Sequence, residues 1–193
     1  MARFIEAFWN RGFLWFQRRA EVARCEGIIL ADVRNTSSHF RNTYLAALQL
    51  IRDHDPRRFV RVQRHIHWIF NCHLPIVMAE YDPGTRTCRV NFEEPLDDQD
   101  LPLWAGFGAC TLIHETTHGI VHARGIHYVA EFRARIERLC VEEENRFVRR
   151  LEHSRPELAH KLYHEFKESE WQGAWTASRW QVFSSLLKQL RRT

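Results

Sequence analysis

The sequence predicts a mostly helical α+β fold, and three observations support this class. Helically spaced apolar residues recur along most of the chain, a strand–turn–strand pattern lies near residue 80, and a long apolar helix follows it. With 45% hydrophobic residues and no internal repeat or flexible linker, residues 1–193 are expected to form one domain. The predicted core covers about residues 56–152.

Two helices are expected before the strands. The first covers residues 43–52, where apolar side chains recur at helical spacing. The second begins at Asp55 and Pro56, because a capping residue followed by proline is typical of a helix start. Its apolar positions are Phe59, Val62, Ile66, Ile69 and Phe70.

A β-hairpin is expected next. Residues 75–81 have the composition of a strand, residues 82–85 are a strong turn signal, and residues 87–92 alternate between two faces. An edge strand of this kind can pair with an extended peptide through main-chain hydrogen bonds.

The most informative motif is H-E-x-x-H, formed by His114, Glu115 and His118 after an apolar lead-in. Positions i and i+4 share one face of a helix, so the two imidazoles can bind one metal ion. Glu115 then lies beside that metal, where it can take a proton from a water molecule as general base. This arrangement is typical of zinc-dependent hydrolysis.

A catalytic zinc needs a third protein ligand, and the sequence offers several candidates. His122 continues the i+4 series, but the helical rise places it about 12 Å from His114, too far to share the ion. His127 follows Gly125, a predicted helix stop, and a loop that folds back would bring it near the motif.

The preferred third ligand is Glu143, on a helix expected over residues 128–151. Its apolar stripe comprises Ile136, Leu139, Cys140, Phe147 and Leu151. Glu143 falls near the centre of that stripe, and a buried carboxylate is costly unless it is paired or bound to metal. Glu144 lies at the edge of the stripe and is the neighbouring alternative.

The stretch 74–151 resembles the catalytic core of gluzincin-type metallopeptidases, which have a zincin-like fold. The resemblance implies Zn²⁺ held by His114, His118 and Glu143, with Glu115 as general base. The stabiliser of the oxyanion is left open among His122, His127 and Tyr128. Residues 81–88 and 135–140 also resemble segments of uncharacterised bacterial proteins.

These motifs predict a zinc metallopeptidase or related hydrolase that cleaves an amide bond in a peptide or protein substrate, with a metal-activated water as nucleophile. The alternative is a non-catalytic, metal-binding regulatory or interaction module of the same fold. In that case the metal would have no open coordination position.

The two ends are aromatic-rich helical extensions, interpreted as packing across the domain or onto a protein partner. Membrane association is not expected, because an aromatic stripe on a helix is far more often buried in packing than placed at a membrane interface. The N-terminal segment does not resemble a signal peptide either, because Glu6, Asn10 and Arg11 interrupt its apolar stretch. Nucleic-acid binding is not expected either, since the 25 arginines behind the net charge of +4 are dispersed among acidic residues. Five cysteines without a C-x-x-C pair predict a reduced, cytoplasmic protein.

Overall fold

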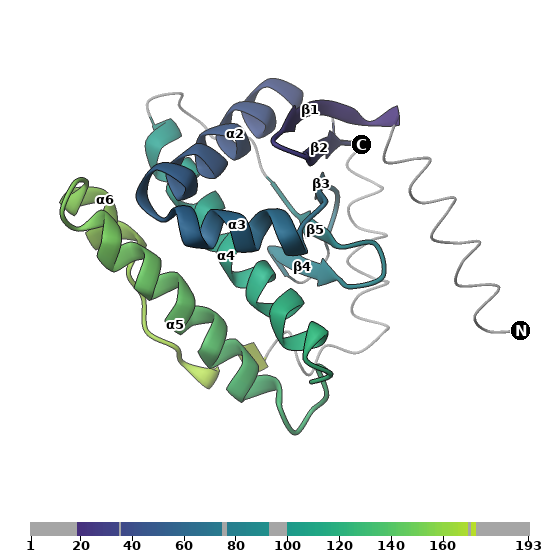
Figure 1. Ribbon diagram of the computed structural model, residues 1–193, viewed down its shortest axis with the longest axis vertical. Helices are drawn as coiled ribbons and strands as arrows, with labels where there is room; N and C mark the ends of the chain where they lie inside the picture. Colours follow the sequence, from purple (N-terminus) through teal and green to yellow (C-terminus); the bar gives the residue numbers. More distant parts are fainter. Residues whose placement is uncertain (1–18, 35, 75–76, 93–99, 170, 173–193) are drawn as a thin grey trace, which may run out of the picture.

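The computed structural model describes residues 19–34, 36–74, 77–92, 100–169 and 171–172 (Figure 1). Within these ranges the chain is α+β and mostly helical, as predicted. The strands are β1 (Glu21–Cys25), β2 (Ile28–Asp32), β3 (Trp68–Asn71), β4 (Ala79–Asp82) and β5 (Thr87–Val90). The helices are α2 (Ser37–His54), α3 (Pro56–His65), α4 (Leu101–Ala123), α5 (Arg133–Leu151) and α6 (Pro156–Leu162). The predicted aromatic extensions lie outside the described residues, except for the start of the second at Trp171.

The strands form one sheet in the order β1-β2-β3-β5-β4. The three central strands β2, β3 and β5 are parallel, and the outer strands β1 and β4 pair antiparallel with their neighbours. The sheet is therefore larger than the predicted hairpin, which corresponds only to β4 and β5. In that hairpin, Asp82 closes the turn by accepting hydrogen bonds from the Gly84 amide and the Thr85 hydroxyl, both at 2.9 Å.

The second predicted helix ends earlier than expected, and its last apolar positions belong to a strand. Helix α3 stops at His65, while Ile69 and Phe70 lie in β3. All four residues of β3 are buried, because β2 and β5 pair with its two edges and both of its faces are covered. A short, wholly apolar run fits a central parallel strand as well as a buried helix segment, so periodicity did not separate them.

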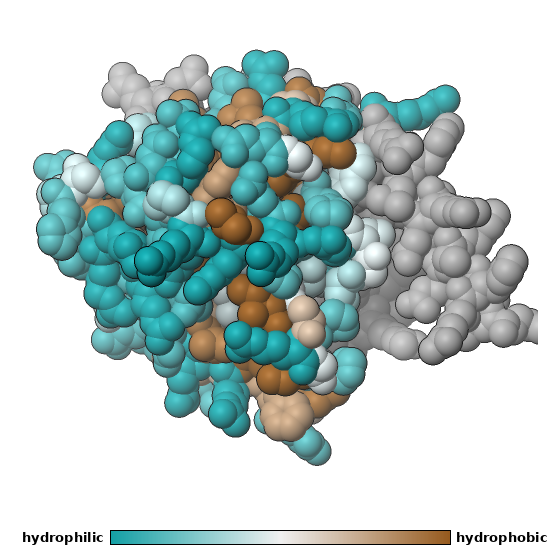
Figure 2. Space-filling model, in the orientation of Figure 1, coloured by the Kyte–Doolittle hydropathy of each residue, from teal (hydrophilic) through white to brown (hydrophobic). Residues whose placement is uncertain are grey.

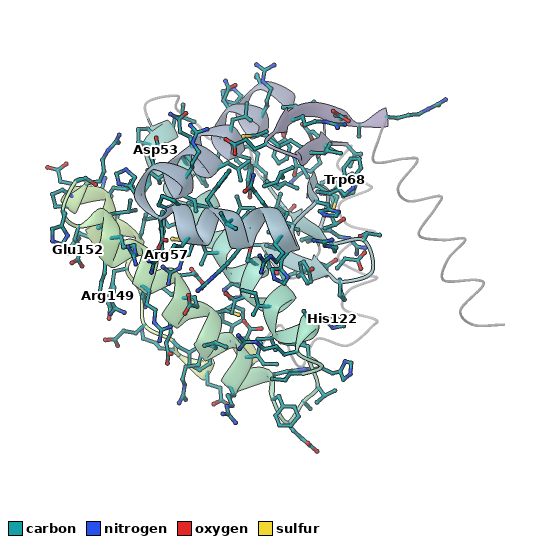
Figure 3. All side chains as sticks on the ribbon, viewed as in Figure 1. Asp53, Arg57, Trp68, His122, Arg149 and Glu152 are labelled. Atoms are coloured by element: carbon teal, nitrogen blue, oxygen red, sulfur yellow. The ribbon has the colours of Figure 1, made fainter. Side chains whose placement is uncertain are left out.

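The hydrophobic core lies between one face of the sheet and the helices. It includes residues outside the predicted range 56–152, namely Ile28 and Leu30 of β2, Phe40 of α2, and Ala159 and Leu162 of α6. The opposite face of the sheet carries a second cluster of Ala31, Trp68 and Phe70. Figure 3 shows Trp68 at the side of the molecule away from α5.

Helix α4 is the central element, and it contacts α2, α3, α5, α6 and β4. Figure 1 shows it between the strands on one side and α5 with α6 on the other. The approach of β4 is close at Gly119, where a Cβ atom would lie 3.0 Å from the hydroxyl of Tyr81. A side chain here would crowd the strand, so the glycine allows β4 to lie directly beside the H-E-x-x-H segment.

No helix in the described ranges has the length and apolar character of a membrane-spanning segment. The face seen in Figure 2 is mostly hydrophilic, with small, separated hydrophobic patches.

Helix α5 is fixed to α3 by a buried ionic network. Asp55 caps α3 by accepting a hydrogen bond from the Arg58 amide, and its carboxylate also pairs with the Arg58 guanidinium. Arg150 reaches the same carboxylate at 2.9 Å, and Arg58 donates to Glu143 at 2.7 Å. Loss of Asp55 would leave the largely buried Arg58 with one carboxylate partner in place of two, and breaking a buried ion pair in this way is destabilising.

Asp55→Ala should lower the free energy of unfolding by about 2–4 kcal/mol, because it removes a helix cap and a buried charge partner together. Urea denaturation measures the change. Asp53→Ala is the matched control, since Asp53 is exposed at the end of α2 and its loss should cost less than about 0.5 kcal/mol. Equal effects of the two changes would contradict a structural role for the network.

Candidate metal centre

Helix α4 buries the H-E-x-x-H segment. The turns before it pack into the core through Ala109, Leu112 and Ile113, so His114 and Glu115 are only 8% and 4% exposed. The rings of His114 and His118 lie side by side, with centroids 5.0 Å apart. The predicted shared face of the two histidines is therefore present.

Helix α5 brings two further donors to these histidines. The chain leaves α4 at Gly125, whose φ of 76° suits glycine, and returns along α4 as α5 (Figure 1). Glu137 then lies with Oε2 at 3.0 Å from Nε2 of His114 and Oε1 at 3.7 Å from Nε2 of His118. One donor atom from each of His114, His118, Glu137 and Cys140 lies within 4.8 Å of the others. We call these four residues the donor cluster.

His114 is held by carboxylates on both of its ring nitrogens. Opposite Glu137, Oε1 of Glu144 lies 2.6 Å from Nδ1. Burial lowers the pKa of His114, but its hydrogen bonds to Glu137 and Glu144 outweigh burial and hold the pKa well above its usual value. Burial likewise raises the pKa of Glu137, and its bonds to the two histidines bring it below its usual value. Either a proton on His114 or a cation bound beside it would therefore compensate the negative charge of the same buried carboxylates.

Glu115 lies beside the donor cluster with one oxygen unsatisfied. Its Oε2 atom is buried and has no hydrogen-bond partner among the described residues. Burial raises the pKa of this carboxyl, and the nearby imidazoles of His114 and His118 oppose the rise. A buried acceptor without a protein partner is uncommon in folded proteins, and it leaves this oxygen available to a water molecule or an ion.

A cavity of about 950 Å³ is lined by His114, His118 and Glu137 of the donor cluster and by Glu115. Residues 77–81 form part of its wall, and they include the first three residues of β4, an edge strand of the sheet. The cavity is also lined by apolar side chains from α4, α5 and the loop between them, namely Val121, Ile126 and Ile136. Trp171 adds a further wall by stacking on the ring of His114 at a centroid distance of 5.5 Å. The cavity is large enough for several residues of an extended peptide.

The structure does not bring Glu143, the preferred third ligand, to the histidines. Its carboxylate instead points toward α3, where it pairs with Arg58, and it also pairs with Arg146 on its own helix. The carboxylate that lies against both histidines is that of Glu137, which was not among the sequence candidates. Glu144, the neighbouring alternative, does reach His114, but at the ring nitrogen away from the donor cluster.

The other candidates lie around the centre rather than in it. His122 lines the cavity and lies near the end of α4 (Figure 3). The centroid of its ring is 5.8 Å from that of His127. Neither residue belongs to the donor cluster. The hydroxyl of Tyr128 donates a hydrogen bond to Glu137, and its ring lies 5.4 Å from that of His118. Tyr128 therefore adjoins the donor cluster and orients Glu137.

The helical phase of α5 explains why Glu137 was missed. The predicted apolar stripe included Leu139, which is 36% exposed, and this moved its apparent centre toward Glu143. The buried face instead runs through Glu137, Cys140, Glu144, Val148 and Leu151. Polar residues hold two positions of this face, so hydrophobicity alone could not locate it. A signal was present in the recurrence of Glu137 and Glu144 seven residues apart, two helical turns on one face.

Comparisons of the chain with protein-family models, with curated proteins and with solved structures gave no match. The chemistry of the site is therefore inferred from its own residues.

Glu137→Gln should weaken zinc binding by more than the roughly 10- to 100-fold that loss of an outer-sphere partner costs, because it removes a charged ligand. Competition with a chelating dye measures the affinity. Glu143→Gln is the control on the same helix. It should lower stability by breaking the pair with Arg58 while leaving zinc affinity unchanged. Weaker zinc binding in Glu143→Gln but not in Glu137→Gln would show instead that Glu143 is the ligand.

Proposed function

We propose that this protein is a zinc-dependent hydrolase of zincin-like fold that cleaves an amide bond in a peptide or protein. The observation that carries the proposal is the unsatisfied, buried Oε2 of Glu115, beside two histidines and a carboxylate at the wall of a cavity. A purely structural glutamate would be expected to have hydrogen-bond partners, whereas a general base must keep an oxygen available for water.

The donor chemistry fits zinc. Two imidazoles and one carboxylate are a ligand set of catalytic zinc sites, and His114, His118 and Glu137 supply them. Zinc bound there would lower the pKa of a coordinated water and polarise a carbonyl group. Glu144 completes the fit, because a carboxylate on the second ring nitrogen orients a metal-binding histidine.

The remaining residues have roles that follow from their positions. Glu115 would accept a proton at Oε2 and return it to the leaving amine, and burial has already moved its pKa in the direction of a base that works near neutral pH. Strand β4 would bind the substrate backbone along the edge that no described strand pairs with. The order of a hairpin with an edge strand followed by the H-E-x-x-H helix supports the zincin-like assignment.

The second candidate function is a non-catalytic metal-binding module, and Cys140 is the observation that favours it. With Cys140 the donor cluster offers four protein ligands, which is the number that closes a structural zinc site. Glu115 separates the two candidates, because a closed structural site has no use for an adjacent unsatisfied carboxylate.

The cysteines support a reducing compartment, and we propose that the protein acts in the cytoplasm. All five are free thiols, and Cys88, Cys110 and Cys140 are buried. A protein without disulfides is typical of a reducing environment.

Purified protein should carry about one zinc ion per chain and cleave members of a fluorogenic peptide library. Glu115→Gln should lower cleavage by roughly 10²- to 10⁴-fold while zinc content stays the same, because the variant loses only the base. Glu142→Gln is the control, because Glu142 is exposed on α5, and this variant should keep both its cleavage activity and its zinc content. Zinc-loaded protein whose cleavage is insensitive to Glu115→Gln would contradict the proposal, and zinc-loaded protein with no cleavage would favour the non-catalytic module.

Glu144→Gln should weaken zinc binding by roughly 10- to 100-fold without changing the stoichiometry at saturating metal, because Glu144 orients His114 rather than binding the ion. Zinc titration by calorimetry measures both quantities. An unchanged affinity would show that Glu144 does not position His114.

A further inference from the structure

We propose that Cys140 is a fourth protein ligand of the metal, bound from the buried side of the site, and that its thiolate makes the site select a soft cation. The inference rests on the metal site proposed above, but it does not depend on hydrolysis.

The first support is the symmetry of the donors on the two helices. Helix α4 presents His114 and His118 one turn apart, and α5 presents Glu137 and Cys140 one turn apart on the face that packs against α4. Residues at i and i+3 or i+4 project from the same side of a helix. The contact between the two helices therefore brings two pairs of donors together, one pair from each helix. Cys140 belongs to the second pair and is not a distant residue.

The second support is distance. Two donor atoms on a tetrahedral zinc lie about 3.3–3.8 Å apart, given bonds of about 2.0 Å to nitrogen or oxygen and 2.3 Å to sulfur. The donor cluster already lies within 4.8 Å, and Glu137 is 3.0 Å from His114 and 3.7 Å from His118. Movements of about 1 Å, available to side chains alone, would bring all four donors to one ion.

The third support is the side from which the thiol approaches. Cys140 is 0% exposed and does not line the cavity, whereas His114, His118 and Glu137 line it together with Val121 and Ile136, the residues that Cys140 packs against. A sulfur ligand in this position would bind the ion without taking up space in the cavity. The thiolate would thus add to the protein's hold on the metal.

The chemical consequence is a preference among metals. Thiolate and imidazole ligands favour zinc, cobalt and cadmium, while Mg²⁺ and Ca²⁺ prefer oxygen. Cys110 provides a comparison within the same pair of helices. It is also buried, one turn before His114 on α4, but it does not belong to the donor cluster.

The test is a cobalt titration of the metal-free, full-length protein, monitored by absorption. Wild-type protein should show an intense thiolate-to-cobalt charge-transfer band in the near ultraviolet together with visible bands. Cys140→Ser should lose the charge-transfer band, keep the visible bands and bind cobalt at least about tenfold more weakly, and Cys110→Ser should match wild type. Cadmium, but not a large excess of Mg²⁺, should displace the cobalt.

X-ray absorption of zinc-loaded wild-type protein tests the same point without a variant, so it stands even if Cys140→Ser does not fold. A sulfur shell at about 2.3 Å is expected, and a shell of nitrogen and oxygen alone at about 2.0–2.1 Å would overturn the proposal. Cobalt binding without the charge-transfer band, or a band that survives Cys140→Ser, would also overturn it while leaving the hydrolase proposal intact. Failure to bind any of these metals would overturn both.

Discussion

The packing of α4 against α5 is the constraint on which the rest of the structure depends. It buries three carboxylates, Glu115, Glu137 and Glu144, beside two imidazoles, and charges of this density are stable in a protein interior only when they compensate one another. His114 meets this requirement by bridging Glu137 and Glu144. The network of Arg58 with Asp55 and Glu143 holds α5 at its other face, so the donors of the two helices stay opposed.

The same packing places the donors at different depths. Cys140 is buried among apolar residues and does not line the cavity, whereas Glu115 lines it and keeps an oxygen without a partner. A centre that only stabilised the fold would need the donor cluster alone. The cavity wall formed by residues 77–81 and the orientation of His114 by Glu144 are features that a reaction on an extended substrate would use.

Strong local signals in the sequence predicted part of this structure. The i, i+4 spacing of His114 and His118 and the turn after Tyr81 depend on neighbouring residues, and both appear as expected. The ligand on α5 could not be derived in the same way, because Glu137 occupies a buried position that a hydrophobic pattern assigns to apolar residues. Strands β1 and β2 were missed, although they form a local antiparallel hairpin. Ile69 was placed in a helix, because the parallel pairing of β3 with the distant strands β2 and β5 determines its conformation.

The central claim is that α4 and α5 together form one zinc site whose carboxylate ligand is Glu137. Anomalous diffraction at the zinc edge, from crystals of the zinc-loaded protein, tests it most directly. We expect a single strong peak between the two helices, in contact with His114, His118 and Glu137, while Glu143 remains paired with Arg58. No peak at this position, or a peak whose carboxylate ligand is Glu143, would contradict the account.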